Sequence, residues 1–98
     1  MYYIEFSKRA DKDKRLLKQA GLEEKTKELL NIIREDPFRT PPAYEKLVGD
    51  LSGNYSRRIN IQHRLVYKVY DNTLKLKDDK GRLYDGLVQI KRMWTHYE

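Results

Sequence analysis

The sequence predicts an α+β protein: one compact domain over residues 1–98, in which two N-terminal helices pack on a mainly antiparallel, twisted sheet. A chain of 98 residues is close to the commonest domain size and too short for two stable cores. Helical periodicity lies in the first third of the chain, whereas the second half is rich in β-branched and aromatic residues. The expected order of elements is therefore β-α-α-β-β-β.

The first strand and the first helix are predicted by their boundary residues. The run Tyr2–Phe6 is aromatic and β-branched, which is typical of a strand. Ser7 follows it, and a serine side chain can accept a hydrogen bond from the free N–H groups at a helix start. We therefore expect an amphipathic helix over residues 8–20, ended by Gly21 in a left-handed conformation.

The second helix is predicted by an apolar stripe. Leu22, Thr26, Leu29 and Ile33 recur at steps of three and four residues, so they share one helix face. The pair Asp36-Pro37 ends this helix, because the residue before a proline disfavours helical geometry. The two helices should form a hairpin with one apolar face.

The remaining strands follow a long connection. Three prolines exclude regular structure from residues 37–42, and residues 44–47 are expected to form a turn or a short helix. Residues 55–61 and 64–70 read as adjacent antiparallel strands, and residues 87–93 as the last one. Turn-forming residues between 71 and 86 predict an elongated final hairpin.

Charge and composition restrict the class of function. The net charge of +6 attracts polyanions, so a nucleic acid or an acidic protein is the first partner to consider. The absence of cysteine excludes a disulfide framework, a thiol nucleophile and a cysteine zinc site. No apolar run approaches the length of a membrane span, and the N-terminus lacks the pattern of a signal peptide. We expect a soluble protein of the cytoplasm.

A basic surface is predicted on the middle strands. Residues 52–70 contain four basic residues and no acidic one, interleaved with tyrosines: Arg57, Arg58, Arg64 and Lys68, with Tyr55, Tyr67 and Tyr70. Arginine binds phosphate oxygens in pairs and aromatic rings stack on unpaired bases, so this pattern suits single-stranded RNA. A solvated strand face is an equally good interpretation, since edge strands often carry Lys and Arg.

Three further residues could carry proton-transfer chemistry. His63 and His96 are the two histidines, and either could exchange a proton near neutral pH. His63 lies in an expected turn, where a hydrogen-bonding role is the ordinary interpretation, whereas His96 stands between aromatic residues near the end of the chain. Glu45 is the one acidic residue between positions 39 and 49. Alone, it is best explained as a surface glutamate.

Several sequence blocks together resemble a known family. The blocks are Leu-Ser-Gly at 51–53, Ser-Arg-Arg-Ile at 56–59, His-Arg-Leu-Val-Tyr at 63–67 and the terminal His-Tyr at 96–97. At this spacing the chain resembles the YoeB/Txe toxins of bacterial type II toxin–antitoxin systems, within the RelE superfamily. The resemblance implies a microbial-ribonuclease-like fold and cleavage of messenger RNA in the ribosomal decoding site by attack of its own 2′-hydroxyl, without metal or cofactor.

The resemblance also implies site residues. Glu45 matches the general base, His96 the general acid, Arg64 the arginine that stabilises the phosphate, and Tyr97 the tyrosine that orients the nucleotide. The candidates for binding RNA phosphate are Arg57, Arg58, Lys46 and Lys68.

The chain departs from the family pattern at three places. Family members commonly carry a lysine three residues after the glutamate, where this chain has Val48, with Lys46 nearby. Residues 74–85 lengthen the last hairpin, and Glu98 follows Tyr97. A carboxylate close to His96 would favour its protonated form, which suits a general acid.

Partners follow from the same resemblance. The expected RNA partners are messenger RNA and the ribosome with its ribosomal RNA. The expected protein partners are a cognate YefM/Axe-like antitoxin, whose acidic segment folds on the basic surface, and a second copy of the toxin in a homodimer. Operator DNA is expected to bind mainly through the antitoxin complex, and no membrane is expected as a partner.

Two alternatives stay open. One is a non-catalytic module that occupies the ribosome or acts as an antitoxin-binding co-repressor. The other is a general nucleic-acid-binding α+β domain, which leaves the His-Tyr terminus unexplained.

Overall fold

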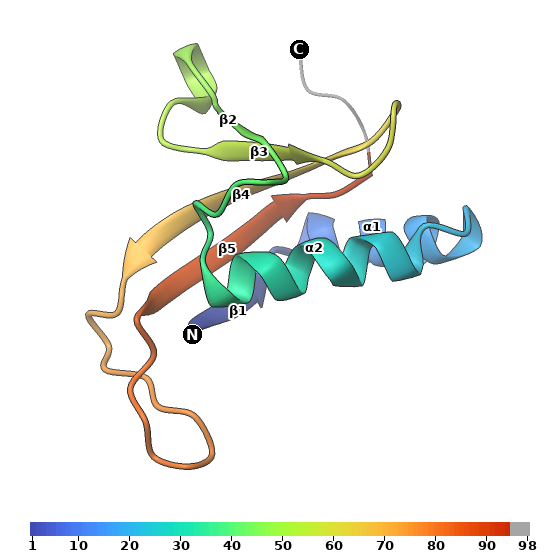
Figure 1. Ribbon diagram of the computed structural model, residues 1–98. Coiled ribbons are helices and arrows are strands. Elements are labelled where there is room, and N and C mark those ends of the chain that lie inside the picture. The colour runs from blue at the N-terminus through green and yellow to red at the C-terminus, as the bar shows by residue number, and fades with distance from the viewer. Residues whose placement is uncertain (95–98) are drawn as a thin grey trace.

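The computed structural model describes residues 1–94, in which two helices cover one face of a five-stranded sheet (Figure 1). The elements are β1 (Tyr2–Phe6), α1 (Lys8–Gln19), α2 (Glu23–Glu35), β2 (Tyr44–Lys46), a 3₁₀ turn (Gly49–Leu51), β3 (Tyr55–Arg58), β4 (Arg64–Asp71) and β5 (Gly86–Arg92). The strand order is β1-β5-β4-β3-β2. β1 is parallel to β5 and the other pairs are antiparallel, so the predicted α+β class is confirmed.

The helix boundaries agree with the sequence prediction. The Ser7 hydroxyl accepts a hydrogen bond from the Ala10 amide at 3.0 Å, which caps α1. Gly21 follows α1 with a φ of 74°, a conformation that costs glycine little. α2 ends at Glu35, directly before Asp36-Pro37.

The core lies between the helices and the sheet. α1 buries Leu17 and α2 buries Leu29 and Ile33, against buried side chains of the central strands: Leu65, Tyr67, Val88 and Ile90. Burial of one such aliphatic side chain contributes about 1.5 to 3 kcal/mol to folding. The core therefore rests on alternate residues of β4 and β5, which lie on one face of the sheet.

The segment 44–47 corrects the sequence prediction. It was expected to form a turn or a short helix, but Tyr44–Lys46 is the edge strand β2, with Glu45 opposite Ser56 of β3. Hydrogen bonds to a strand ten residues further along the chain stabilise this extended conformation, and a local pattern does not reveal them. Glu45 is thereby fixed in the sheet.

The strand expected over residues 55–61 is shorter than predicted. β3 ends at Arg58, because the next residues form a tight loop in which the His63 carbonyl accepts hydrogen bonds from the Ile59 and Asn60 amides. The Asn60 side chain in turn accepts from the amides of Gln62 and His63. This loop brings Arg64 directly opposite Arg58.

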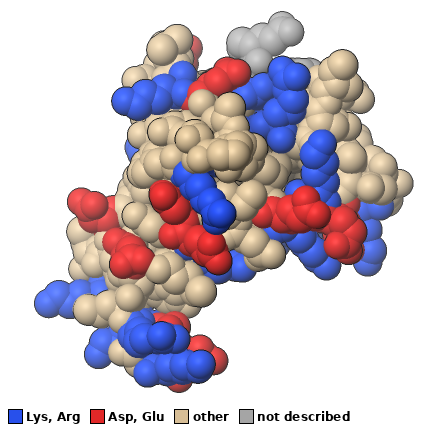
Figure 2. Space-filling model, in the orientation of Figure 1, with Lys and Arg blue, Asp and Glu red and all other residues tan. Residues whose placement is uncertain are grey.

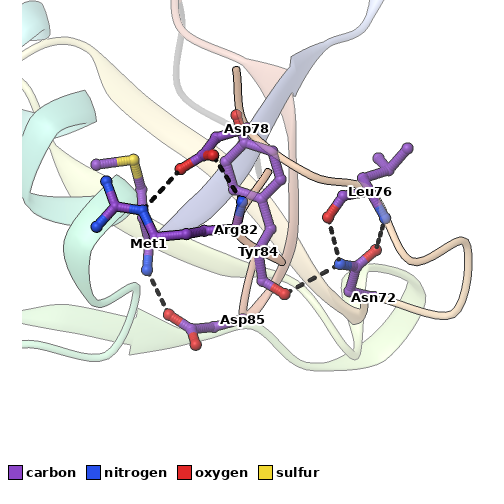
Figure 3. A network of polar contacts seen from close by, with 7 residues as sticks. All are labelled: Met1, Asn72, Leu76, Asp78, Arg82, Tyr84 and Asp85. Atoms are coloured by element: carbon purple, nitrogen blue, oxygen red, sulfur yellow. Dashed lines mark hydrogen bonds and ion pairs between the residues drawn. The ribbon is translucent and has the colours of Figure 1, made fainter. Parts of the chain in front are cut away.

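The lengthened hairpin, residues 72–85, forms an arm that projects from the end of β4 and β5 (Figure 1). Figure 3 shows how it is braced: the Asn72 amide donates to the carbonyls of Leu76 and Tyr84 and accepts from the Leu76 amide. The Asp78 carboxylate accepts from the amides of Lys80 and Arg82. These bonds lower the pKa of Asp78. The arm is thus an ordered structure, at the opposite end of β4 from Arg64.

Candidate functional site

The two faces of the sheet differ in what covers them. α1 packs against β1 and β5, and α2 against β1, so both helices lie on one side. The other side, here the open face, carries the alternate residues of β2 to β5. Pairing across the strands assigns to it Glu45, Ser56, Arg58, Arg64, Val66, Lys68 and Arg92. Within residues 1–94, no helix is long and apolar enough to cross a membrane.

Glu45 and Arg64 form an ion pair on the open face. The Arg64 side chain extends from β4 across β3, where its Nε donates to the Ser56 hydroxyl at 2.6 Å. Its Nη2 then lies 3.2 Å from Oε1 of Glu45 on β2. Arg64 is nearly enclosed, with 12% of its side chain exposed, whereas Glu45 is 62% exposed. The arrangement presents a carboxylate to solvent with a fixed arginine beside it.

Arg58 and Lys68 extend this positive surface. Arg58 is exposed and directly opposite Arg64 in the register of β3 and β4. Lys68 lies on the same face four residues further along β4, with Nζ 5.2 Å from the centre of the Tyr70 ring. The structure therefore brings together Glu45, Arg58 and Arg64 and places Lys68 further along the same face.

Arg57 is not on this surface, which corrects its assignment to RNA binding. Its side chain is fully buried on the opposite face of β3. The guanidinium donates to the carbonyls of Pro37, Arg39 and Pro42 at 2.7 to 2.9 Å, and Nε donates to the Tyr67 hydroxyl at 3.1 Å. Because its donors are all directed into the protein, Arg57 holds the proline-rich connection against the sheet instead of contacting a ligand.

Lys46 and two of the tyrosines are also separated from the open face. Lys46 is opposite Tyr55, one residue out of phase with Glu45, so it lies on the other side of β2. Tyr55 and Tyr67 pack in an aromatic cluster with Phe38 and Tyr44, at ring-centre distances of 5.1 to 5.9 Å. These two tyrosines stabilise the fold and are not presented for stacking on bases.

His63 belongs to the structure around the site. Its ring is buried and stacked on Trp94, with ring centres 4.0 Å apart and planes 18° apart. Trp94 is the last described residue, and His63 immediately precedes Arg64. The predicted catalytic residues His96 and Tyr97 lie outside the described residues.

Two residues of the open face were missed by sequence reasoning. Ser56 is fully buried and orients Arg64 through its hydroxyl. Arg92 is opposite Val66 at the end of β5, on the same face as Arg64. Ser56 lies within the Ser-Arg-Arg-Ile block, and its alternation with Arg57 along a strand could have indicated that the two residues lie on opposite faces. No sequence signal indicated the position of Arg92, because that position depends on the pairing of β5.

The site is suited to chemistry on an anionic substrate. In Figure 2, basic side chains gather at the end of the molecule where β3 lies, whereas acidic and basic side chains mix over α2 and on the arm. Within residues 1–94, no group of three His, Cys, Asp or Glu side chains could hold a metal ion. A carboxylate beside fixed guanidinium groups can accept a proton next to a phosphate and compensate the negative charge that develops there.

Comparison with known proteins agrees with this arrangement. Residues 3–81 match the family described as the YoeB-like toxin of bacterial type II toxin-antitoxin system. The chain is 45% identical over 62 residues to Toxin YoeB of a Synechocystis strain, which covers 63% of this chain and 65% of that toxin, less than two thirds of its length.

Solved structures extend the similarity to nearly the whole chain. The YoeB-YefM toxin-antitoxin heterotetramer of Staphylococcus aureus is matched with a TM-score of 0.69 and 32% identity over 99% of both chains. The YoeB dimer of the same organism is matched with a TM-score of 0.70 and 33% identity over 98% of both. This chain therefore belongs to the family of YoeB-like toxins of bacterial type II toxin–antitoxin systems.

Proposed function

We propose that this protein, as a single toxin domain over residues 1–98, is an endoribonuclease of the bacterial cytoplasm that cleaves messenger RNA in the ribosomal decoding site. The observation that carries the proposal is the Glu45–Arg64 pair, 3.2 Å apart on the open face with Arg58 opposite Arg64. Family membership adds the expectation of a toxin that acts on translation.

The proposed reaction needs a base, a positive site and an acid. The Glu45 carboxylate removes the proton from a 2′-hydroxyl, and the oxygen attacks the adjacent phosphorus. Arg64 and Arg58 compensate the charge that accumulates on the phosphoryl oxygens. His96 donates its proton to the departing 5′-oxygen, and Tyr97 orients the nucleotide. The products are a 2′,3′-cyclic phosphate and a free 5′-hydroxyl.

The geometry supports these roles at three points. Glu45 is accessible to a substrate, and its neighbour Arg64 is held by Ser56, so the charge is fixed before the substrate arrives. The segment that carries His96 and Tyr97 follows Trp94, which is stacked on His63 beside Arg64. The tail thus begins at the end of the sheet where the base and the arginines lie.

The proposed partners follow from the similar proteins. The S. aureus relatives are described as a YoeB-YefM complex and as a YoeB dimer. We propose that a cognate YefM-like antitoxin neutralises this toxin, that the complex binds its operator mainly through the antitoxin, and that the toxin can dimerise. An acidic antitoxin segment would complement the net charge of +6.

Primer-extension mapping of messenger RNA in translating ribosomes tests the activity. The wild type should produce cuts in phase with codons, whereas Glu45→Gln and His96→Gln should each reduce cleavage about 10²- to 10⁴-fold. Lys46→Gln is the matched control, because Lys46 lies beside Glu45 but on the other face of β2. Arrested translation without any cuts would favour occupation of the ribosome instead, and undiminished cutting by His96→Gln would refute its role as the acid.

A further inference from the structure

We propose that Arg92 is a further phosphate-binding residue of this site, which holds a phosphate of the RNA strand beside the one that is cleaved. The inference rests on the proposed ribonuclease function and deepens it. No sequence motif pointed to Arg92, and its position follows from the pairing of β5 with β4.

The register of the sheet aligns Arg92 with the candidate catalytic residues. Glu45 is opposite Ser56, Ser56 opposite Val66, and Val66 opposite Arg92, which makes one row across β2 to β5. Four adjacent strands span about 14 Å. Arg64 precedes Val66 by two residues on the same face, so it is the diagonal neighbour of Arg92. Diagonal neighbours are typically about 7 to 8 Å apart, which long side chains can bridge.

A β-bulge decides that Arg92 occupies this position. Tyr67 is opposite Ile90, and regular pairing would set Val66 opposite Lys91, but the register shifts and Val66 is opposite Arg92. Bulges redirect side chains and are common beside active sites. Here Ile90 before the bulge and Met93 after it are both fully buried, so the bulge accommodates two core residues three positions apart and leaves the arginine on the open face.

Arg92 lacks the partners that a partly buried arginine usually has. Its Nε is buried and makes no hydrogen bond within residues 1–94. The carboxylates of the described residues form ion pairs with Arg64, Arg39, Arg82, two lysines and the Met1 amine, but not with Arg92 or Arg58. A buried donor without a partner is unfavourable, and three neighbouring guanidinium groups repel one another. A phosphate bound beside the partly exposed Arg92 side chain would offset this repulsion.

RNA suits this arrangement better than a single acidic side chain. Arg58, Arg64 and Arg92 lie on three adjacent strands of one face, and Glu45 is the acidic side chain that lies with them. Three adjacent strands span about 10 Å, which is wider than one phosphate, so the arginines fit an anion with repeated charges along its length. Guanidinium groups bind phosphate oxygens in pairs.

Binding of a short single-stranded 2′-O-methyl RNA, which cannot be cleaved by its own 2′-hydroxyl, tests Arg92 separately from catalysis. We expect Arg92→Gln to weaken binding about 10-fold and to reduce the slope of log affinity against log salt concentration by about 0.7, the loss of one phosphate contact. Arg92→Lys should retain the slope because it retains the charge. Arg15→Gln, an exposed arginine of α1 on the helix side, is the matched control.

Two results would overturn the inference. One is an Arg92→Gln variant whose RNA affinity and salt slope equal those of Arg15→Gln. The other is unchanged RNA binding with weakened binding of an acidic antitoxin peptide, which would make Arg92 a protein contact. Arg92→Lys has a similar length and the same charge as the wild type, so RNA binding by this variant can still be measured if Arg92→Gln unfolds. Failure of the proposed function shows up differently, as a wild type that binds this RNA but cuts no messenger RNA on the ribosome.

Discussion

Arg57 and Arg58 are consecutive residues of β3 with opposite environments. Arg57 lies on the side of the helices, where it is fully buried and donates hydrogen bonds to three backbone carbonyls and a tyrosine. Arg58 lies on the open face, exposed and opposite Arg64. The comparison shows that a cluster of basic residues in a sequence does not predict a basic surface, because alternation along a strand divides the cluster between two faces.

The two faces should therefore respond differently to substitution. On the helix side, loss of an arginine should reduce stability, since buried carbonyls lose their donors. On the open face, loss of an arginine should reduce activity and leave the fold intact.

The largest expected effect is a loss of stability on the helix side of the sheet. Arg57→Met should lower the free energy of unfolding by about 3 to 5 kcal/mol, because the carbonyls of Pro37, Arg39 and Pro42 lose charged donors together. Urea denaturation measures this. Arg58→Met is the matched control and should change stability by about 0.5 kcal/mol or less. Equal losses in the two variants would show that the faces do not differ in this way.

The next effect is on activity at the open face. Arg64→Gln should reduce messenger RNA cleavage about 10²- to 10³-fold, because it removes a fixed positive charge beside Glu45. Its melting temperature should fall less than that of Arg57→Met, since Arg64 makes one side-chain hydrogen bond, to Ser56, and pairs with an exposed carboxylate. Primer-extension mapping of messenger RNA in translating ribosomes and thermal unfolding of the purified variant check both statements. A variant that melts early and cuts normally when folded would contradict the assignment.

A smaller effect on stability is expected when the hydroxyl of Tyr67 is removed and its ring is kept. This hydroxyl accepts from Arg57 Nε and donates to the Pro37 carbonyl at 2.7 Å. Tyr67→Phe retains the ring in the core but should lower stability by about 1 to 2 kcal/mol. Tyr70→Phe, on the open face of the same strand, should be nearly neutral. Stability is measured by denaturation as before, and a loss for Tyr70→Phe as large as that for Tyr67→Phe would count against the role of the buried hydroxyl.

The smallest expected effect is a pH dependence of stability that is due to Tyr67. Burial raises the pKa of Tyr67 above 10.0, although Arg57 acts in the opposite direction. A raised folded-state pKa means that the stability due to the neutral phenol is complete below pH 10 and is lost as the pH rises through the folded pKa. Unfolding measured between pH 8 and 11 should show this loss, and Tyr67→Phe should lack that part of it. An identical alkaline loss in both proteins would refute the link to Tyr67.

Local features allowed much of the fold to be predicted. Ser7 and Gly21 mark the ends of α1 because capping depends on a few neighbouring residues. Aromatic and β-branched residues predicted the strands at residues 2–6 and 64–70, where β1 and β4 form. The family resemblance indicated Glu45, Arg58 and Arg64, and the structure brings these three together on one face.

Pairing between distant segments could not be predicted in the same way. β2 is a strand because β3 pairs with it, and this pairing sets Glu45 on the open face and Lys46 on the other. The burial of Arg57 depends on carbonyls 15 to 20 residues earlier in the chain. The position of Arg92 depends on a bulge between β4 and β5.

The sequence by itself determined the order of most elements, the helix ends, the positive charge and the family. These properties depend on composition, on periodicity and on residues a few positions apart. Only the tertiary structure decided which of the arginines are presented to a substrate and which support the fold. The physical reason is that a side chain's environment depends on strand register and on the segment that covers it, and both are set by contacts between residues far apart in the chain.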